Sequence, residues 1–147
     1  MEREMLTKEP GAEMIIKTHV LWSLGAGLMP VPLLDIVAVT AIQIDMLRQL
    51  AANYKVDFSA STGKTFVAAL TGGAFARLGA SMVKAIPGVG SVVGGISMSV
   101  MSGASTYAVG QVARKYFVAG ADLSKVDVGE AKKAYSQEFE RGKHVVS

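Results

Sequence analysis

The chain has 147 residues, of which half are hydrophobic and only 18% are charged, with 16 glycines and no cysteine. Such an apolar chain must pack densely or place apolar surface against lipid or a partner. A net charge of +3 without a clustered basic segment argues against nucleic-acid binding. The lack of cysteine excludes disulfides and thiolate metal sites.

The N-terminal segment, residues 1–13, mixes acidic and basic side chains and has little to bury. We expect it to be frayed or only partly helical. It lacks the basic start and apolar stretch of a secretory signal, which predicts that the chain stays on the cytoplasmic side.

The first hairpin is predicted from an apolar run over residues 15–24 that ends in glycines and a Pro-Val-Pro step. Proline disfavours helix at the preceding residue, so Pro30 breaks the first helix. Pro32 suits the first turn of the next helix, which we expect to span residues 32–53. A polar connection over residues 53–62 follows.

The second hairpin has the same plan, with a helix predicted over residues 63–85 and another over residues 91–117. The break between them contains Pro87, Gly88 and Gly90. Beyond it, residues 121–147 form an amphipathic C-terminal helix and tail, because their apolar side chains recur at helical spacing.

No segment alternates apolar and polar residues long enough to require a strand. The predicted fold is therefore all-α, with two helix–break–helix hairpins of apolar helices over residues 14–120. The polar segment 1–13 precedes this domain, and the amphipathic helix of residues 121–147 closes it.

Small residues recur every four positions in the second hairpin. The third helix carries Ala68, Gly72, Ala76 and Ala80, and the fourth carries Ser91, Gly95, Ser99 and Gly103. Residues four apart share a helix face, so each helix has a strip that allows close backbone approach. We expect the two strips to face each other across the hairpin; an unusually tight soluble bundle is the plainer interpretation.

No charged residue lies between Lys84 and Arg114, a stretch long enough to cross a bilayer. Gly and Ser lower the hydrophobicity of this stretch, and the Pro-Gly step shortens it. A shallow or re-entrant hairpin is therefore favoured over a spanning one. The charged segments 1–17, 48–64 and 114–143 would then share one side, which places the chain at the cytoplasmic face of the inner membrane. A purely cytoplasmic location is the alternative.

Two acids in the second predicted helix, Asp35 and Asp45, are candidate intramembrane or interface groups, because carboxylates are costly at membrane depth. An ordinary helix-start role for Asp35, and a rim or helix–helix contact for Asp45, are the simpler interpretations. His19 and Trp22 lie three residues apart and could mark an interface level.

Nothing in the sequence predicts an enzyme, a cofactor or a metal site. Gly63-Lys64-Thr65 looks like the end of a phosphate-binding loop, but the pattern needs a glycine at position 58, where Phe58 stands. A helix start is the better interpretation of that tripeptide. No Ser–His–acid set can be assembled from the chain.

Two motifs carry a family resemblance: Gly27-Leu28-Met29-Pro30-Val31-Pro32-Leu33-Leu34-Asp35, and the later Ile86-Pro87-Gly88-Val89-Gly90. Together they resemble the YcjF-like, DUF697-type bacterial domain of unknown function, which is often attached to small Ras-like GTPase domains. The resemblance implies a helical, membrane-associated module linked to a GTPase. This chain has no GTPase domain, so any such switch would be a separate protein.

The sequence thus predicts a non-enzymatic, membrane-associated helical module that self-associates and acts as an anchor, scaffold or membrane-shaping element. Its expected partners are membrane lipid, further copies of itself and a separate small GTPase, with no nucleic acid. The alternative is a soluble homo-oligomeric shell or filament that buries its apolar faces between copies.

Overall fold

The computed structural model describes the backbone of residues 2–26, 32–84 and 98–146, and the side chains of residues 11–25, 37–72 and 99–146. Its helices are α1 (Glu2–Ala26), α2 (Pro32–Asn53), α3 (Ala60–Lys84), α4 (Met98–Val118), the short 3-10 helix η2 (Leu123–Lys125) and α5 (Val128–Val146). The all-α prediction is confirmed, and the described residues contain no strand.

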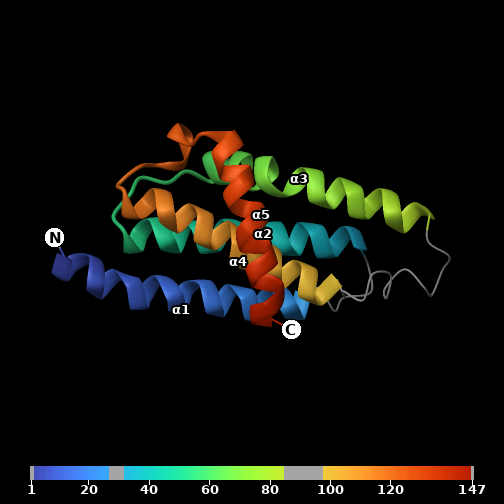
Figure 1. Cartoon of the computed structure of the whole chain (residues 1–147), viewed down its shortest axis with the longest axis horizontal. Helices are drawn as coiled ribbons and strands as arrows, with labels where there is room; N and C mark the ends of the chain where they lie inside the picture. The colour runs from blue at the N-terminus through green and yellow to red at the C-terminus, as the bar shows by residue number, and fades with distance from the viewer. Residues whose placement is uncertain (1, 27–31, 85–97, 147) are drawn as a thin grey trace.

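Helices α1 to α4 run in alternating directions along the long axis of the molecule, and α5 crosses them obliquely (Figure 1). Local signals explain several of the boundaries. Pro32 is the first residue of α2, where its fixed φ suits a helix start. Asp127 precedes α5, and its Oδ1 accepts a hydrogen bond from the backbone N of Glu130 at 3.1 Å. The predicted hairpin-tip residues Pro30, Pro87, Gly88 and Gly90 lie outside the described residues.

The N-terminal segment differs from expectation, because α1 begins at Glu2 and runs through it without a break. Ala12 is fully buried. Gly11 lies against the end of α2, where an added Cβ would be 2.8 Å from Oδ1 of Asn53. The helix is thus supported by packing that the polar composition of residues 1–13 does not reveal.

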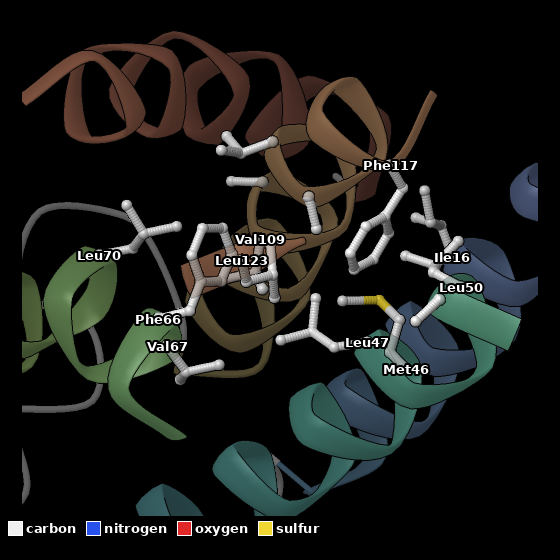
Figure 2. Close-up of a cluster of buried hydrophobic side chains, with 14 of the residues drawn as sticks. Ile16, Met46, Leu47, Leu50, Phe66, Val67, Leu70, Val109, Phe117 and Leu123 are labelled. Carbon is white, nitrogen blue, oxygen red and sulfur yellow. The ribbon is translucent and has the colours of Figure 1, made fainter. Parts of the chain in front are cut away.

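The hydrophobic core gathers around α4, which contacts α1, α2 and α5. Figure 2 shows side chains of α1, α2, α3, α4 and η2 meeting in this core. They are Ile16 of α1, Met46, Leu47 and Leu50 of α2, Phe66, Val67 and Leu70 of α3, Val109 and Phe117 of α4, and Leu123 of η2. The centre of the fold is therefore one helix enclosed by the others.

Small residues let neighbouring helices approach α4 closely. A Cβ on Gly110 would lie 2.9 Å from Cγ1 of Ile16 in α1. A Cβ on Gly142 of α5 would lie 3.0 Å from both the Cα and the carbonyl O of Ala104. Both glycines stand where a larger side chain would separate two helices.

The described part of the small-residue strips does not follow the predicted facing arrangement. Ser99 donates a hydrogen bond to the carbonyl O of Leu24 in α1 at 2.7 Å, and Gly103 packs against the same Leu24 side chain. Ala68 and Gly72 are exposed on α3. A four-residue spacing marks a face for close approach but does not say which helix uses it. The side chains of Ala76, Ala80, Ser91 and Gly95 are outside the described residues.

Candidate functional site

Polar side chains join α1 to α2 around His19, which is buried. Its Nε2 lies 2.9 Å from Oδ2 of Asp45, and its Nδ1 lies 2.7 Å from the carbonyl O of Ile15, one turn earlier in α1. Both of these neighbours are acceptors. Each bond forms when the ring nitrogen concerned carries a proton.

Asp45 is the centre of this cluster on the α2 side. Arg48 donates a hydrogen bond to its Oδ1, and Nε2 of Gln49 donates to its Oδ2 at 2.7 Å. The hydrogen bond from His19 and the neighbouring Arg48 hold the pKa of the Asp45 carboxyl below its usual value, against the opposing effect of partial burial. Asp45 is thus an acid that joins α1 to α2 through its contact with His19.

A second polar group lies deeper, where α1, α2, α4 and α5 meet. Ser23 and Thr106 hydroxyls are 2.6 Å apart. Nε2 of Gln43 donates to Oγ1 of Thr106 at 3.1 Å and to Oγ of Ser105 at 3.2 Å. The hydroxyl of Tyr135 donates to the same Ser105 oxygen at 2.9 Å. All five side chains are buried.

This deeper group is nearly, but not fully, satisfied. Within the part of the chain that the structure describes, Oε1 of Gln43 is buried without a hydrogen-bond partner. Burial raises the pKa of Tyr135, so its hydroxyl keeps its proton and acts as a donor. The group contains hydroxyls and an amide but no base in hydrogen-bond contact, and this arrangement suits holding helices in register better than catalysis.

Glu138 is a third polar feature, buried on the inner side of α5. Its Oε1 lies 3.2 Å from Nη1 of Arg141 and 3.9 Å from Nζ of Lys115 in α4. The carboxylate is therefore neutralised by two exposed cations. The sequence did not reveal it, because the C-terminal helix was assessed by the spacing of its apolar side chains alone.

Among the side chains that the structure describes, the other predicted site residues lie apart from these three polar features. The side chain of Asp35 is outside the described residues. Gly63, Lys64 and Thr65 lie in the first turns of α3, in agreement with a helix start. Trp22 points outward and is 67% exposed, although its neighbour His19 is buried.

The described residues contain no group of three or more His, Cys, Asp or Glu side chains placed to hold a metal. None of the helices, over the residues described, has the length and apolar content needed to cross a membrane.

The outer face of α1 carries large apolar side chains. Met14, Leu21 and Trp22 are each about two-thirds exposed. Beside Leu21, a groove of about 540 Å³ runs between α1, α4 and the end of α5. The exposed face of α1 therefore carries apolar side chains beside this groove.

Comparison with known proteins gives two relationships. The profile of DUF697, a domain of unknown function, matches residues 8–143. The chain is also 40% identical over 137 residues to "Magnetosome membrane protein 22" of Magnetospirillum gryphiswaldense, an alignment covering 90% of this chain and 70% of that protein. No solved structure matches the chain.

Proposed function

The chain belongs to the DUF697 family, and on that premise we propose that it is a non-enzymatic, membrane-associated helical module. It self-associates and serves as an anchor, scaffold or membrane-shaping element. A similar protein that is named as a magnetosome membrane protein supports the membrane part of this proposal.

The observation that carries the proposal is the unequal distribution of charge between the two ends of the bundle. Helix α1 ends, α2 begins, α3 ends and α4 begins at the same end of the molecule (Figure 1). The sequence next to these helix ends, residues 26–34 and 85–97, contains no charged residue, and the charged residues Asp35 and Lys84 stand at the borders of these two stretches. The opposite end holds the N-terminus and the charged connection between α2 and α3.

This polarity suits a molecule that places one end in a lipid surface and keeps the other in water. Charged side chains are costly in hydrocarbon, whereas an end with long uncharged stretches can enter the interface. We propose that the apolar end inserts shallowly at the cytoplasmic face of the inner membrane.

Self-association draws on two exposed surfaces. Ala68 and Gly72 are small, exposed residues on α3 that would let another helix approach closely. Met14 and Trp22 on α1 present large apolar side chains. A separate small GTPase is the proposed protein partner, by resemblance to family members that carry such a domain. The alternative function is a soluble homo-oligomeric shell or filament in which these surfaces meet between copies.

Vesicle flotation of the full chain tests the proposal. We expect the protein to float with phosphatidylethanolamine–phosphatidylglycerol vesicles. The double variant Met29→Glu/Val89→Glu, which charges the apolar end, should remain at the bottom of the gradient. The matched variant Ala52→Glu/Ala119→Glu adds the same charge at exposed positions of the other end and should float.

Two results would overturn the proposal. The first is a wild-type chain that does not bind vesicles and is monodisperse in solution. If that monodisperse species is a large assembly, the shell or filament is the correct function. The second is flotation of both double variants to the same extent as wild type, which would show that the apolar end is not the membrane contact.

A further inference from the structure

The groove beside α1 has the lining of a binding site for an apolar chain. Its walls are Ile16, Val20, Leu21 and Leu24 of α1 and Val145 and Val146 of α5. Its volume, about 540 Å³, falls within the range of ~300–1,000 Å³ that small-molecule sites occupy. At Gly103, an added Cβ would lie 2.7 Å from Leu24 and 3.4 Å from Val146. Three helices therefore close one end of the groove.

The groove is polar at its other end. Glu13 and Lys17 of α1 and Gln111 of α4 line it there, and Nη1 of Arg114 donates to Oε1 of Gln111 at 3.4 Å. Among the described side chains, neither Glu13 nor Lys17 makes a salt bridge. The groove thus has a charged mouth and an apolar floor, the polarity of an amphiphile.

The length of the groove is close to the depth of one leaflet of a bilayer. From Glu13 to Leu24 the helix rises about 16 Å, at ~1.5 Å per residue. One leaflet of the ~30 Å hydrocarbon core has about that depth. A single acyl chain laid along α1 would therefore reach from the charged mouth to the floor at Gly103.

We propose that this groove binds one acyl chain of a zwitterionic phospholipid, with the headgroup between Glu13 and Lys17. The carboxylate of Glu13 complements an ammonium group, and the ammonium of Lys17, one turn away, complements a phosphate. This site goes beyond membrane association through the apolar end of the bundle, because a chain could insert that end with the groove empty.

Calorimetric titration with lauroyl lysophosphatidylethanolamine, below its micelle concentration, tests the proposal on the full chain. Val145→Trp fills the groove from an exposed rim position, and Val37→Trp is its matched control on the outer face of α2; the two valines are 61% and 66% exposed. We expect Val145→Trp to weaken binding by about tenfold or more and Val37→Trp to leave it unchanged. Leu21→Trp, at the opposite rim, repeats the test if Val145→Trp fails to fold.

The headgroup is tested separately. Lys17→Gln should weaken binding of the same lipid about threefold, as expected for a solvent-exposed ion pair, while Lys64→Gln on α3 should not. Equal binding by Val145→Trp, Leu21→Trp and Val37→Trp would overturn the site. Equal affinity for glycerophosphoethanolamine would overturn the acyl chain, and tighter binding of lauric acid would overturn the zwitterionic headgroup.

The vesicle experiment separates this proposal from the proposed function. A Val145→Trp chain that floats normally but no longer binds the lysolipid supports the groove as a separate site. A wild-type chain that binds the lysolipid but does not float with vesicles would overturn membrane association and leave the groove proposal standing.

Discussion

At the scale of single residues, the joint between α1 and α2 depends on the charge of Asp45. Its carboxylate accepts hydrogen bonds from His19, Arg48 and Gln49. These bonds favour the ionised form and keep the pKa of Asp45 low. Asp45 thus connects two helices by polar contacts, and its partner His19 lies 26 positions away in the sequence.

This arrangement predicts a pH-dependent effect of Asp45→Asn. A carboxyl with a depressed pKa stabilises the fold above its unfolded value of about 3.9, and that contribution is lost as the pH falls through the folded value. We expect Asp45→Asn to lower the free energy of unfolding by about 1 kcal/mol or less at pH 7, because the side chain is partly exposed. The difference should shrink as the pH falls below about 3.9 and through the lowered pKa of the folded protein.

Urea denaturation of both proteins across that pH range measures the effect. Asp57→Asn, at an exposed position in the connection after α2, is the control and should show no pH-dependent difference. A wild-type advantage over Asp45→Asn that is the same at every pH would contradict the role assigned to the carboxylate.

The buried polar group gives a second prediction at this scale. Gln43→Met removes two hydrogen bonds together with the unpartnered Oε1. Ser105 still has Tyr135 and Thr106 still has Ser23, so we expect a loss of less than about 1 kcal/mol.

Thr106→Val is the contrasting variant. It leaves the buried hydroxyl of Ser23 without the partner it has now, so we expect it to cost about 1–3 kcal/mol. Chemical denaturation of the two variants measures both losses. If Gln43→Met were the more damaging of the two, the amide would have a role that these hydrogen bonds do not explain.

At the scale of helices, α4 is the element around which the others assemble. Ala104 and Ala108 are fully buried in it, and α5 crosses it at Gly142. Close approach at this crossing depends on the absence of a side chain, because the nearest atoms belong to the backbone of α4 and cannot move aside.

Alanine substitution should therefore have opposite effects at two helical glycines. Gly142→Ala places a Cβ 3.0 Å from Ala104, and we expect it to lower stability by about 1–3 kcal/mol. Gly72→Ala, with nothing within 4 Å of its Cβ, should raise stability by about 0.5–1 kcal/mol through helix propensity. Thermal unfolding followed by circular dichroism compares them, and a stabilising Gly142→Ala would show that α5 does not pack as described.

The helix boundaries were largely predictable at this scale. The second predicted helix, 32–53, matches α2, and the third was expected to begin three residues later than α3 does. Proline, glycine and helical periodicity act locally, which is why they locate helices well. The same local signals missed the helix over residues 2–13, where Gly11 packs against Asn53 at the end of α2.

At the scale of the whole molecule, α5 is part of the same core as the four preceding helices. Tyr135 donates to Ser105, and Leu123 and Ala131 belong to the buried cluster. A chain ending at residue 120 would expose the side of α4 that these residues cover. We therefore expect the fragment 1–120 to lose the cooperative unfolding transition that the full chain shows.

Calorimetry of the full chain and of the fragment, both in the same buffer, measures this difference. Aggregation or a broad, weakly cooperative transition is the expected behaviour of the fragment. A sharp transition within a few degrees of the full chain would instead show that residues 1–120 fold independently of α5.

The sequence by itself determined the helical class, the bounds of α2, the family and the separation of charged from apolar segments. These follow from residue type and short spacing, which act within one or two turns. Only the tertiary structure decided that α4 is the central helix, that the strip at Ser99 and Gly103 packs on α1, and that His19 meets Asp45. Those pairings join residues far apart in the chain, and their energies depend on which surfaces fit together when all the helices pack at once.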